Sequence, residues 1–310
     1  MQYKQTALQL TLLLCSSVAF SQTTFLTQGA KENILIERME IKAQTDSVLN
    51  FSKTRPFSRR QVVPALDQLD TLANQSKVDQ FNLYTAQMGN LEWTSADQSR
   101  FASKKPLWKN FFQTPATLFE VNQKDFFLSV NPVFQYYVGK EKDNNQHIFL
   151  NTRGIVLRGR IADKIGFAAY VTDNQERDPL YVQQWVNERK AVPNQGFYKD
   201  FKTTGYDYFD ARGYITFSAT KYIDIVFGYD RNFIGNGHRS MLLSDFSSNA
   251  LFLKLNTRIW KFNYQNIFME LVGANRFGAD ILLPKKYAAL HHLDLQVTKW
   301  LNIGLFEGVV

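Results

Sequence analysis

The residues best suited to chemistry lie between positions 228 and 246, in the stretch GYDRNFIGNGHRSMLLSDF. This stretch combines glycines, arginines, aspartates and a histidine, which are residue types found in phosphate-binding loops and catalytic corners. A phosphate loop needs Gly-x-x-x-x-Gly-Lys-Ser/Thr between a strand and a helix, whereas these glycines lead into Arg239, Ser240 and a strand-like segment. We therefore interpret the stretch as a long loop in which Gly235 and Gly237 adopt positive φ.

The histidines do not have the spacing that a metal site requires. His291 and His292 are adjacent in a predicted strand, so their side chains point to opposite faces of a sheet and cannot bind one ion together. His238 has no partner at metal-ligand spacing. Ser240, close to His238, lacks the orienting base of a catalytic triad. The sequence therefore predicts no metal, no cofactor and no enzymatic activity.

Two pairs of carboxylates are candidates for glycosidase chemistry, Asp207 with Asp210 and Glu176 with Asp178. That chemistry requires two carboxyl groups ~5–9 Å apart across a cleft, which sequence spacing alone does not supply. We interpret these acids as solvated loop residues. A secreted β-protein with glycan-hydrolase activity is the alternative hypothesis, and it predicts recovery in the soluble fraction.

From Asp125 onward, short segments that alternate apolar and polar residues predict about nine β-strands. The connections between them alternate in length. Those near Asp163 and Thr220 span a few residues, whereas 172–206 and 231–249 are much longer. Short turns at one end and long loops at the other are typical of an outer-membrane β-barrel.

One face of the predicted strands carries Arg158, Arg160, Asp230 and Lys254, which suit a water-filled lumen better than the core of a soluble barrel. We therefore predict a mainly β fold, an antiparallel transmembrane outer-membrane β-barrel, with these four residues facing the lumen. A secreted β-sandwich also alternates its faces and is the alternative fold. Because single-chain bacterial barrels normally have an even number of strands, we expect the sequence to be the front part of a longer barrel.

The first 124 residues follow a different pattern. Residues 1–21 combine a basic start, a short apolar stretch and a small-residue end, which predicts a cleaved signal peptide. Residues 22–124 are predicted to form a helical periplasmic region with an aromatic connector, and 125–310 the barrel strands. Ser58 and Ser76 are the predicted caps of two helices in this region.

Cysteine usage and charge narrow the functional classes. The one cysteine, Cys15, lies in the predicted signal peptide, so the mature chain offers neither a disulfide nor a thiolate metal site. The net charge of +8 permits acidic partners in general. Nucleic acid is not an expected partner of a chain that begins with a signal peptide.

Two segments resemble a known family. They are GYDRNFIGNGHRSMLLSDFSSNALFLKL, which begins at Gly228, and SKKPLWKNFFQTPATLFEVNQKDFFLSVNPV, which begins at Ser103. Together with the order of signal peptide, helical region and strands, they are similar to the capsule-assembly Wzi-type outer-membrane proteins, in particular to Bacteroidetes relatives, some of them described as gliding-motility RemB-like. The resemblance covers most of the mature chain. It implies a large barrel that holds surface polysaccharide at the cell outer membrane, and it supplies no catalytic motif.

The long loops carry the predicted binding residues. Glycans are recognised by aromatic platforms beside amide and guanidinium hydrogen-bonding groups. The candidates of these types are Tyr181, Trp185, Arg189, Asn232, Asn236, His238 and Arg239. The expected partners are surface polysaccharide or lipopolysaccharide, together with outer-membrane lipid. The alternative function is an outer-membrane component of a gliding-motility or protein-secretion machinery that acts through protein partners.

Overall fold

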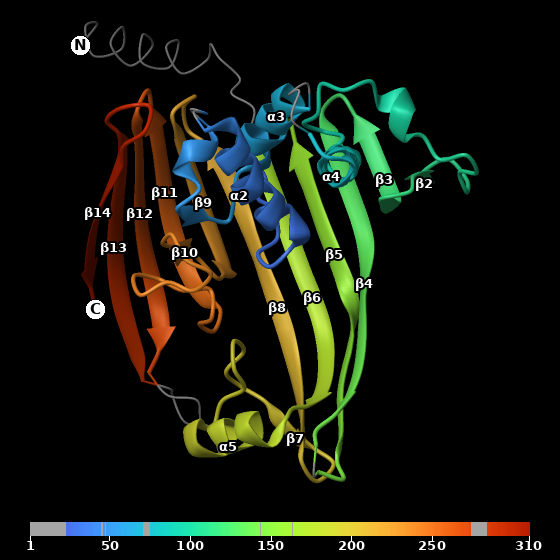
Figure 1. Ribbon diagram of the computed structural model, residues 1–310, viewed down its shortest axis with the longest axis vertical. Helices are drawn as coiled ribbons and strands as arrows, with labels where there is room; N and C mark the ends of the chain where they lie inside the picture. Colours follow the sequence, from blue (N-terminus) through green and yellow to red (C-terminus); the bar gives the residue numbers. More distant parts are fainter. Residues whose placement is uncertain are drawn as a thin grey trace, which may run out of the picture.

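The computed structural model describes residues 23–310 except 45, 47, 71–74, 143, 163 and 274–283. The predicted signal peptide lies outside the described residues. One large antiparallel sheet curves around a group of helices, which lie on its concave side near one end (Figure 1). Another helix, α5 (Leu180–Arg189), lies at the opposite end of the sheet (Figure 1).

The helical region contains α2 (Lys31–Ala43), α3 (Arg59–Leu69) and α4 (Lys77–Met88). Short 3-10 turns lie at Leu49–Phe51 and Gln98–Phe101.

Both predicted caps stand directly before the first residue of their helices, but only one of them makes a capping hydrogen bond. Ser76 forms a capping box with Asp79 at the start of α4, as its position predicted. Ser58 precedes α3, yet its hydroxyl lies 2.8 Å from that of Thr23 and makes no capping bond. The hydroxyl of Ser58 thus ties α3 to the segment before α2.

The helical region has a conventional apolar core. Leu66 of α3, Ile36 and Met39 of α2, and Leu83 of α4 are almost completely buried against one another. Burying one such side chain contributes ~1.5–3 kcal/mol to stability. The remaining members of this core are Leu26, Leu35, Leu49, Phe57, Val62, Val63, Ala65, Leu69 and Ala86.

The large sheet contains twelve strands in the order β14-β13-β12-β11-β9-β8-β6-β5-β4-β3-β2, with β7 paired to β8. The first strands are β2 (Phe111–Thr114), β3 (Thr117–Gln123), β4 (Phe126–Lys140), β5 (His147–Ile161), β6 (Ile165–Arg177) and β7 (Lys199–Phe201). The others are β8 (Gly205–Ser218), β9 (Ile223–Asp230), β11 (Ala250–Ile259), β12 (Phe262–Val272), β13 (Lys285–Gln296) and β14 (Asn302–Val309).

The prediction of a mainly β fold with antiparallel strands is confirmed, and the boundary of the sheet is corrected. The sheet begins in the connector at Phe111, because β3 pairs with β4 and β2 pairs with β3, whereas the sequence placed the first strand after Asp125. Within the described residues the sheet is open, with β2 and β14 as its two edge strands.

The predicted asymmetry of the connections is present. Short turns join β5 to β6, β8 to β9, β11 to β12 and β13 to β14 at the end where the helical region lies (Figure 1). The long connections after β6, β9 and β12 start from the opposite end. One of them contains β10 (Phe233–Ile234), which runs back along the concave side and pairs with β1 (Thr54–Arg55) of the helical region.

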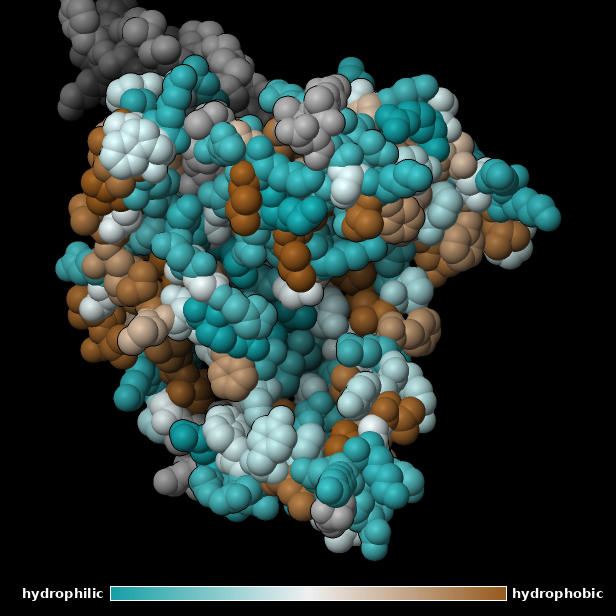
Figure 2. All heavy atoms as spheres, in the orientation of Figure 1, coloured by the Kyte–Doolittle hydropathy of each residue, from teal (hydrophilic) through white to brown (hydrophobic). Residues whose placement is uncertain are grey.

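The two faces of the sheet have opposite character. Its concave face buries polar side chains such as Thr152, Asp224 and Lys254. Its convex face leaves large apolar side chains uncovered, with Phe227 at 54% and Leu305 at 62% exposure. Figure 2 shows hydrophilic side chains in the hollow of the concave side and hydrophobic ones along the margin formed by β13 and β14.

Polar groups on the convex face pair with one another. Arg153 forms an ion pair of 2.9 Å with Asp173 on the neighbouring strand. The ring nitrogen Nδ1 of His291 lies 2.6 Å from the amide oxygen of Asn266. His292, the next residue, is buried on the concave side, so the two histidines point to opposite faces as predicted.

Candidate functional site

The concave face of the sheet binds the helical region through charged and polar contacts. Arg60 of α3 forms an ion pair of 2.9 Å with Asp224 of β9. Arg258 of β11 donates 2.8 Å to the side-chain oxygen of Gln61. The hydroxyl of Thr216 on β8 donates 2.5 Å to a backbone carbonyl of the segment before α2. Because this ion pair and these hydrogen bonds depend on direction, they fix the orientation of the helical region against the sheet.

All four residues predicted to face the lumen lie on the concave face, and at least three of them bind other residues there. Arg158 reaches Glu92 of the helical region at 2.7 Å and donates to the carbonyl of Gly89 at 2.8 Å. Arg160 is half-buried on the same face of β5. Arg158 therefore helps to hold the helical region in place.

Lys254 is 1% exposed, and its ammonium donates 2.9 Å to the side-chain oxygen of Asn232. The same ammonium lies 5.0 Å from the centre of the Phe25 ring, an arrangement that suits a cation–π contact. Asp230, the fourth predicted residue, faces Arg212 at 3.7 Å. A lysine buried in this way contributes to the packing between the helical region, β11 and the loop after β9.

This packing shifts the pKa values of charged groups in the helical region. Burial alone would raise the pKa of Glu92, but the guanidinium of Arg158 outweighs burial and holds the pKa below its usual value. Arg59 of α3 is also buried, and this lowers its pKa to about 10. The surroundings of Arg59 therefore oppose its positive charge.

The two long loops meet at Asp210, which lies on the concave face of β8. Asn249 donates 3.0 Å to one of its carboxylate oxygens, and Gln195 lies 3.4 Å from the other. Arg212 and Arg231 add ion pairs of 3.2 and 3.6 Å. Asp210 thus fixes the inner ends of both loops at a single buried carboxylate.

Three of the four carboxylates considered for glycosidase chemistry, Glu176, Asp207 and Asp210, lie in strands and not in solvated loops. Asp207 and Asp210 are both in β8, where alternation places them on opposite faces, and the side chain of Gln175 donates 3.1 Å to Asp207. Asp178 is half-buried after β6, and burial raises its pKa. The expectation of solvated loop acids was wrong because β6 and β8 are longer than their alternation suggested.

Helix α5 carries three of the predicted glycan-binding residues. Tyr181 is 73% exposed, and the guanidinium of Arg189 lies 5.1 Å from the centre of the Trp185 ring. The inner side of α5 packs Val186 against a small core that includes Tyr206, and Trp185 packs partly against the same core. An exposed tyrosine beside an Arg–Trp stack, on a helix held by its own core, is an arrangement that a sugar ring can contact.

The other predicted residues lie in the loop between β9 and β11, where some are exposed and one is buried. Asn236 and His238 are exposed. Arg239 is exposed as well, but it is paired with Asp245 at 3.3 Å. Asn232 is 1% exposed and bound to Lys254, so the prediction that it faces a ligand on the surface is corrected.

The glycine prediction for this loop is half right. Gly235 has φ of +156°, and its amide donates 2.8 Å to the carbonyl of Lys53 in the helical region. Gly237 does not adopt positive φ. The positive φ is therefore required at Gly235, where the loop leaves β10 and contacts the helical region.

Sequence reasoning missed the roles of Asp210, Arg212, Gln195 and Asn249, and it considered Asp210 only as one of a carboxylate pair. A signal existed for two of them, because Asp210, Arg212 and Tyr214 alternate along one strand and must share a face. Nothing in the local sequence marks Gln195 or Asn249, since their roles depend on how two separate loops fold back.

In the described part of the chain, no helix is long and apolar enough to cross a membrane. Among those same residues, no three His, Cys, Asp or Glu side chains gather closely enough to hold a metal ion. In comparisons with known proteins, the chain matches no family model, no curated protein and no solved structure.

Proposed function

We propose that this chain forms part of the wall of an outer-membrane β-barrel, holds its helical region inside on the periplasmic side, and binds surface polysaccharide without catalysing a reaction. Helix α5 is then on the outside of the cell, whereas the loop after β9 starts at that end and folds back along the concave side. In this proposal α5 and the loop after β9 provide the binding surface.

The observation that carries the membrane part is the inverted distribution of side chains in the sheet. Ile215, Phe227 and Leu305 are each more than half exposed on the convex face, while Asp224 and Lys254 are buried on the concave face. A large apolar side chain left in water forfeits ~1.5–3 kcal/mol. Lipid around the convex face would remove that cost for every such residue at once.

The polysaccharide part is supported by the position and composition of α5. It lies at the end of the sheet opposite the helical region (Figure 1) and exposes Tyr181 beside the stacked Trp185 and Arg189. Aromatic faces and guanidinium donors are the groups with which proteins contact sugars. The core beneath α5 limits the entropy that binding would cost.

Cell fractionation tests the membrane part. The protein is expected in outer membranes, and its gel mobility should change on heating, because a closed barrel stays compact until it is unfolded. Recovery in the soluble fraction with ordinary mobility would overturn the proposal and support the secreted hydrolase alternative.

Matched tyrosine variants test the polysaccharide part. Tyr181→Ala should weaken binding of purified surface polysaccharide by about tenfold, the loss expected for one stacked aromatic contact. Tyr222→Ala is the control, since Tyr222 is 42% exposed at the short-turn end of the sheet. Equal binding by the two variants, or unchanged surface glycan in a deletion strain, would contradict the proposal.

A second function is favoured by the surface of the helical region. Four apolar side chains there are at least 65% exposed: Ile34, Ile41, Val78 and Phe81. Figure 2 shows hydrophobic side chains among hydrophilic ones over the helices. Contacts of this kind suit a protein partner, as expected for a component of a gliding-motility or secretion machinery.

Affinity purification from detergent extracts separates the two functions. A stoichiometric protein partner that is lost in Phe81→Asp and is retained without polysaccharide favours the second one. Binding of polysaccharide with no such partner favours the first.

A further inference from the structure

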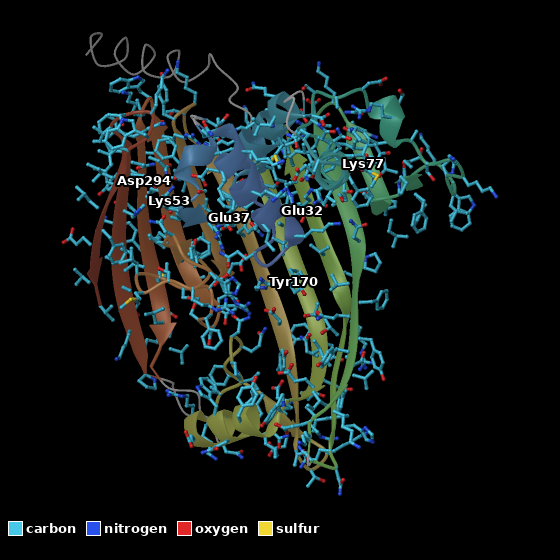
Figure 3. The ribbon with its side chains drawn as sticks, in the orientation of Figure 1. Glu32, Glu37, Lys53, Lys77, Tyr170 and Asp294 are labelled. Carbon is cyan, nitrogen blue, oxygen red and sulfur yellow. The ribbon has the colours of Figure 1, made fainter. Side chains whose placement is uncertain are left out.

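A cavity of about 110 Å³ lies between the helical region and the concave face of the sheet. The helical region lines it with Phe25, Pro56 and Arg59, among others, and the sheet lines it from β4, β5, β6, β8 and β9. Tyr170, one of its lining residues, lies on the concave side of β6 and is labelled in Figure 3. A cavity of ~150 Å³ can hold a benzene-sized molecule, so this one has room for a small group of atoms.

Cationic side chains outnumber anionic ones in the lining. The lining contains three arginines from three separate elements, Arg59, Arg158 and Arg212. It contains one carboxylate, that of Asp230. Two of these arginines are held by carboxylates. Arg158 binds Glu92 at 2.7 Å, and Arg212 lies between Asp210 at 3.2 Å and Asp230 at 3.7 Å.

Arg59 differs from the other two arginines. It is 7% exposed, and its Nη1 donates 3.2 Å to the amide oxygen of Asn90, a neutral partner. Its Nε is buried and has no hydrogen-bond partner among the described residues. Leaving a buried donor of a charged group unsatisfied is costly. The nearby cation Arg158 adds to that cost, since burial and Arg158 both lower the pKa of Arg59.

An anion in the cavity would balance the charge of the Arg59 guanidinium, whose hydrogen bond to Asn90 has a neutral acceptor. A carboxylate is planar and can accept two parallel hydrogen bonds from a guanidinium fork. Arg212 stacks on the ring of Tyr170 at 4.2 Å, which keeps a second guanidinium in a fixed orientation in the lining. The cavity volume fits a carboxylate with one or two attached carbons, and it is too small for a complete sugar ring.

We propose that this cavity binds a carboxylate group through Arg59. The group is either a free small carboxylic acid or the carboxylate of an acidic sugar whose ring stays in the hollow outside the cavity. Only the second source rests on the proposed polysaccharide function.

Acetate is the probe for this site. The full chain in detergent should bind ¹³C-labelled acetate, detected by NMR saturation transfer, and excess chloride should not displace it. Arg59→Gln should weaken acetate binding by about ten- to hundredfold, which corresponds to the loss of a charge-assisted hydrogen bond. Arg59→Lys should recover part of the binding, because it keeps the charge but loses the planar fork.

A second pair of variants covers the case in which Arg59→Gln fails to fold. Ala168 lines the cavity on the concave side of β6, so Ala168→Met should fill the cavity and abolish acetate binding without changing any charge. Ala211 lies between Asp210 and Arg212, and alternation therefore places its side chain on the convex face of β8. Ala211→Met adds the same group outside the cavity and should bind acetate like the parent protein.

The results separate this proposal from the polysaccharide function. If the parent protein does not bind acetate, or if Ala168→Met binds it equally well, the carboxylate site is wrong even when polysaccharide binding through Tyr181 persists. If acetate binds and an acidic oligosaccharide competes with it, the group comes from a glycan. If acetate binds and the oligosaccharide does not compete, the source is a free carboxylic acid.

Discussion

The helical region and the sheet bury opposite kinds of side chain. In the helical region Leu66 and Ile36 are enclosed, as in a water-soluble domain. In the sheet Lys254 and Asp224 are enclosed, while Phe227 and others remain uncovered on the convex face. One chain can therefore bury apolar side chains in one region and polar side chains in another, when the two regions have different surroundings.

The contact between the two regions is mainly polar. Arg60 with Asp224 and Arg158 with Glu92 cross it as ion pairs. Phe25 is an exception, because it packs into the apolar cluster around Val226 on the concave face. The helical region is therefore held mainly by directional bonds.

The largest expected effect comes from breaking one of these bonds. Arg158→Met leaves Glu92, whose side chain is 2% exposed, as an unpaired buried carboxylate. The expected loss in the free energy of unfolding is ~3–5 kcal/mol, measured by urea titration in detergent. Adding Glu92→Gln to this variant should restore most of the loss. A single variant as stable as the parent would mean that the polar contact does not hold the two regions together.

The second prediction addresses the convex face. Leu253→Arg puts a charge on a face that we propose lies in lipid, and it should destabilise folding into lipid vesicles by ~2–4 kcal/mol. Leu253→Met is the matched control and should change little. Leu253 is 39% exposed, so in a water-soluble sheet the arginine variant would change stability by only ~0.5 kcal/mol. A change that small would contradict the proposal that the convex face lies in lipid.

The smallest expected effect concerns pH and the helical region. Hydrogen bonds from Arg38, Lys42 and Ser76 hold the pKa of Asp79 well below its usual range. Because the folded pKa lies below the unfolded value of ~3.9, the stabilisation is complete above about pH 5 and declines as pH falls through 3.9 toward the folded pKa. Solvent screens the contribution, since the side chain of Arg38 is 52% exposed.

Thermal unfolding followed by circular dichroism from pH 6 to pH 3 tests this dependence. The parent protein should lose stability across the range, and Asp79→Asn should lose less over the same interval. Parallel curves for the two proteins would rule out Asp79 as the source.

Local patterns predicted much of the fold. Alternation over segments such as Leu251–Leu255 located the long strands and their two faces, and the lengths of the connections placed long loops at one end. The Ser76 cap was also predictable, because it depends on residues only three positions apart. The early strands β2 and β3 were missed because the pairing of β3 with β4, and of β2 with β3, outweighs a weak local pattern.

The candidate site was less predictable than the strands. Tyr181, Trp185 and Arg189 were found by residue type, and α5 brings them onto one helix. The convergence of both loops on Asp210 and the burial of Asn232 depend on contacts between distant segments. The pairing of Arg158 with Glu92 joins residues 66 positions apart, and no local spacing encodes it.

The sequence by itself determined which side chains share a face, because the twofold alternation of a strand is a property of the backbone. Only the tertiary structure decided what each face meets. Arg158, Asp230 and Lys254 point inward by alternation, but their partners come from the helical region, from strand β8 and from a loop that folds back along the sheet. Burial depends on which segments approach from far along the chain, and local periodicity carries no information about that approach.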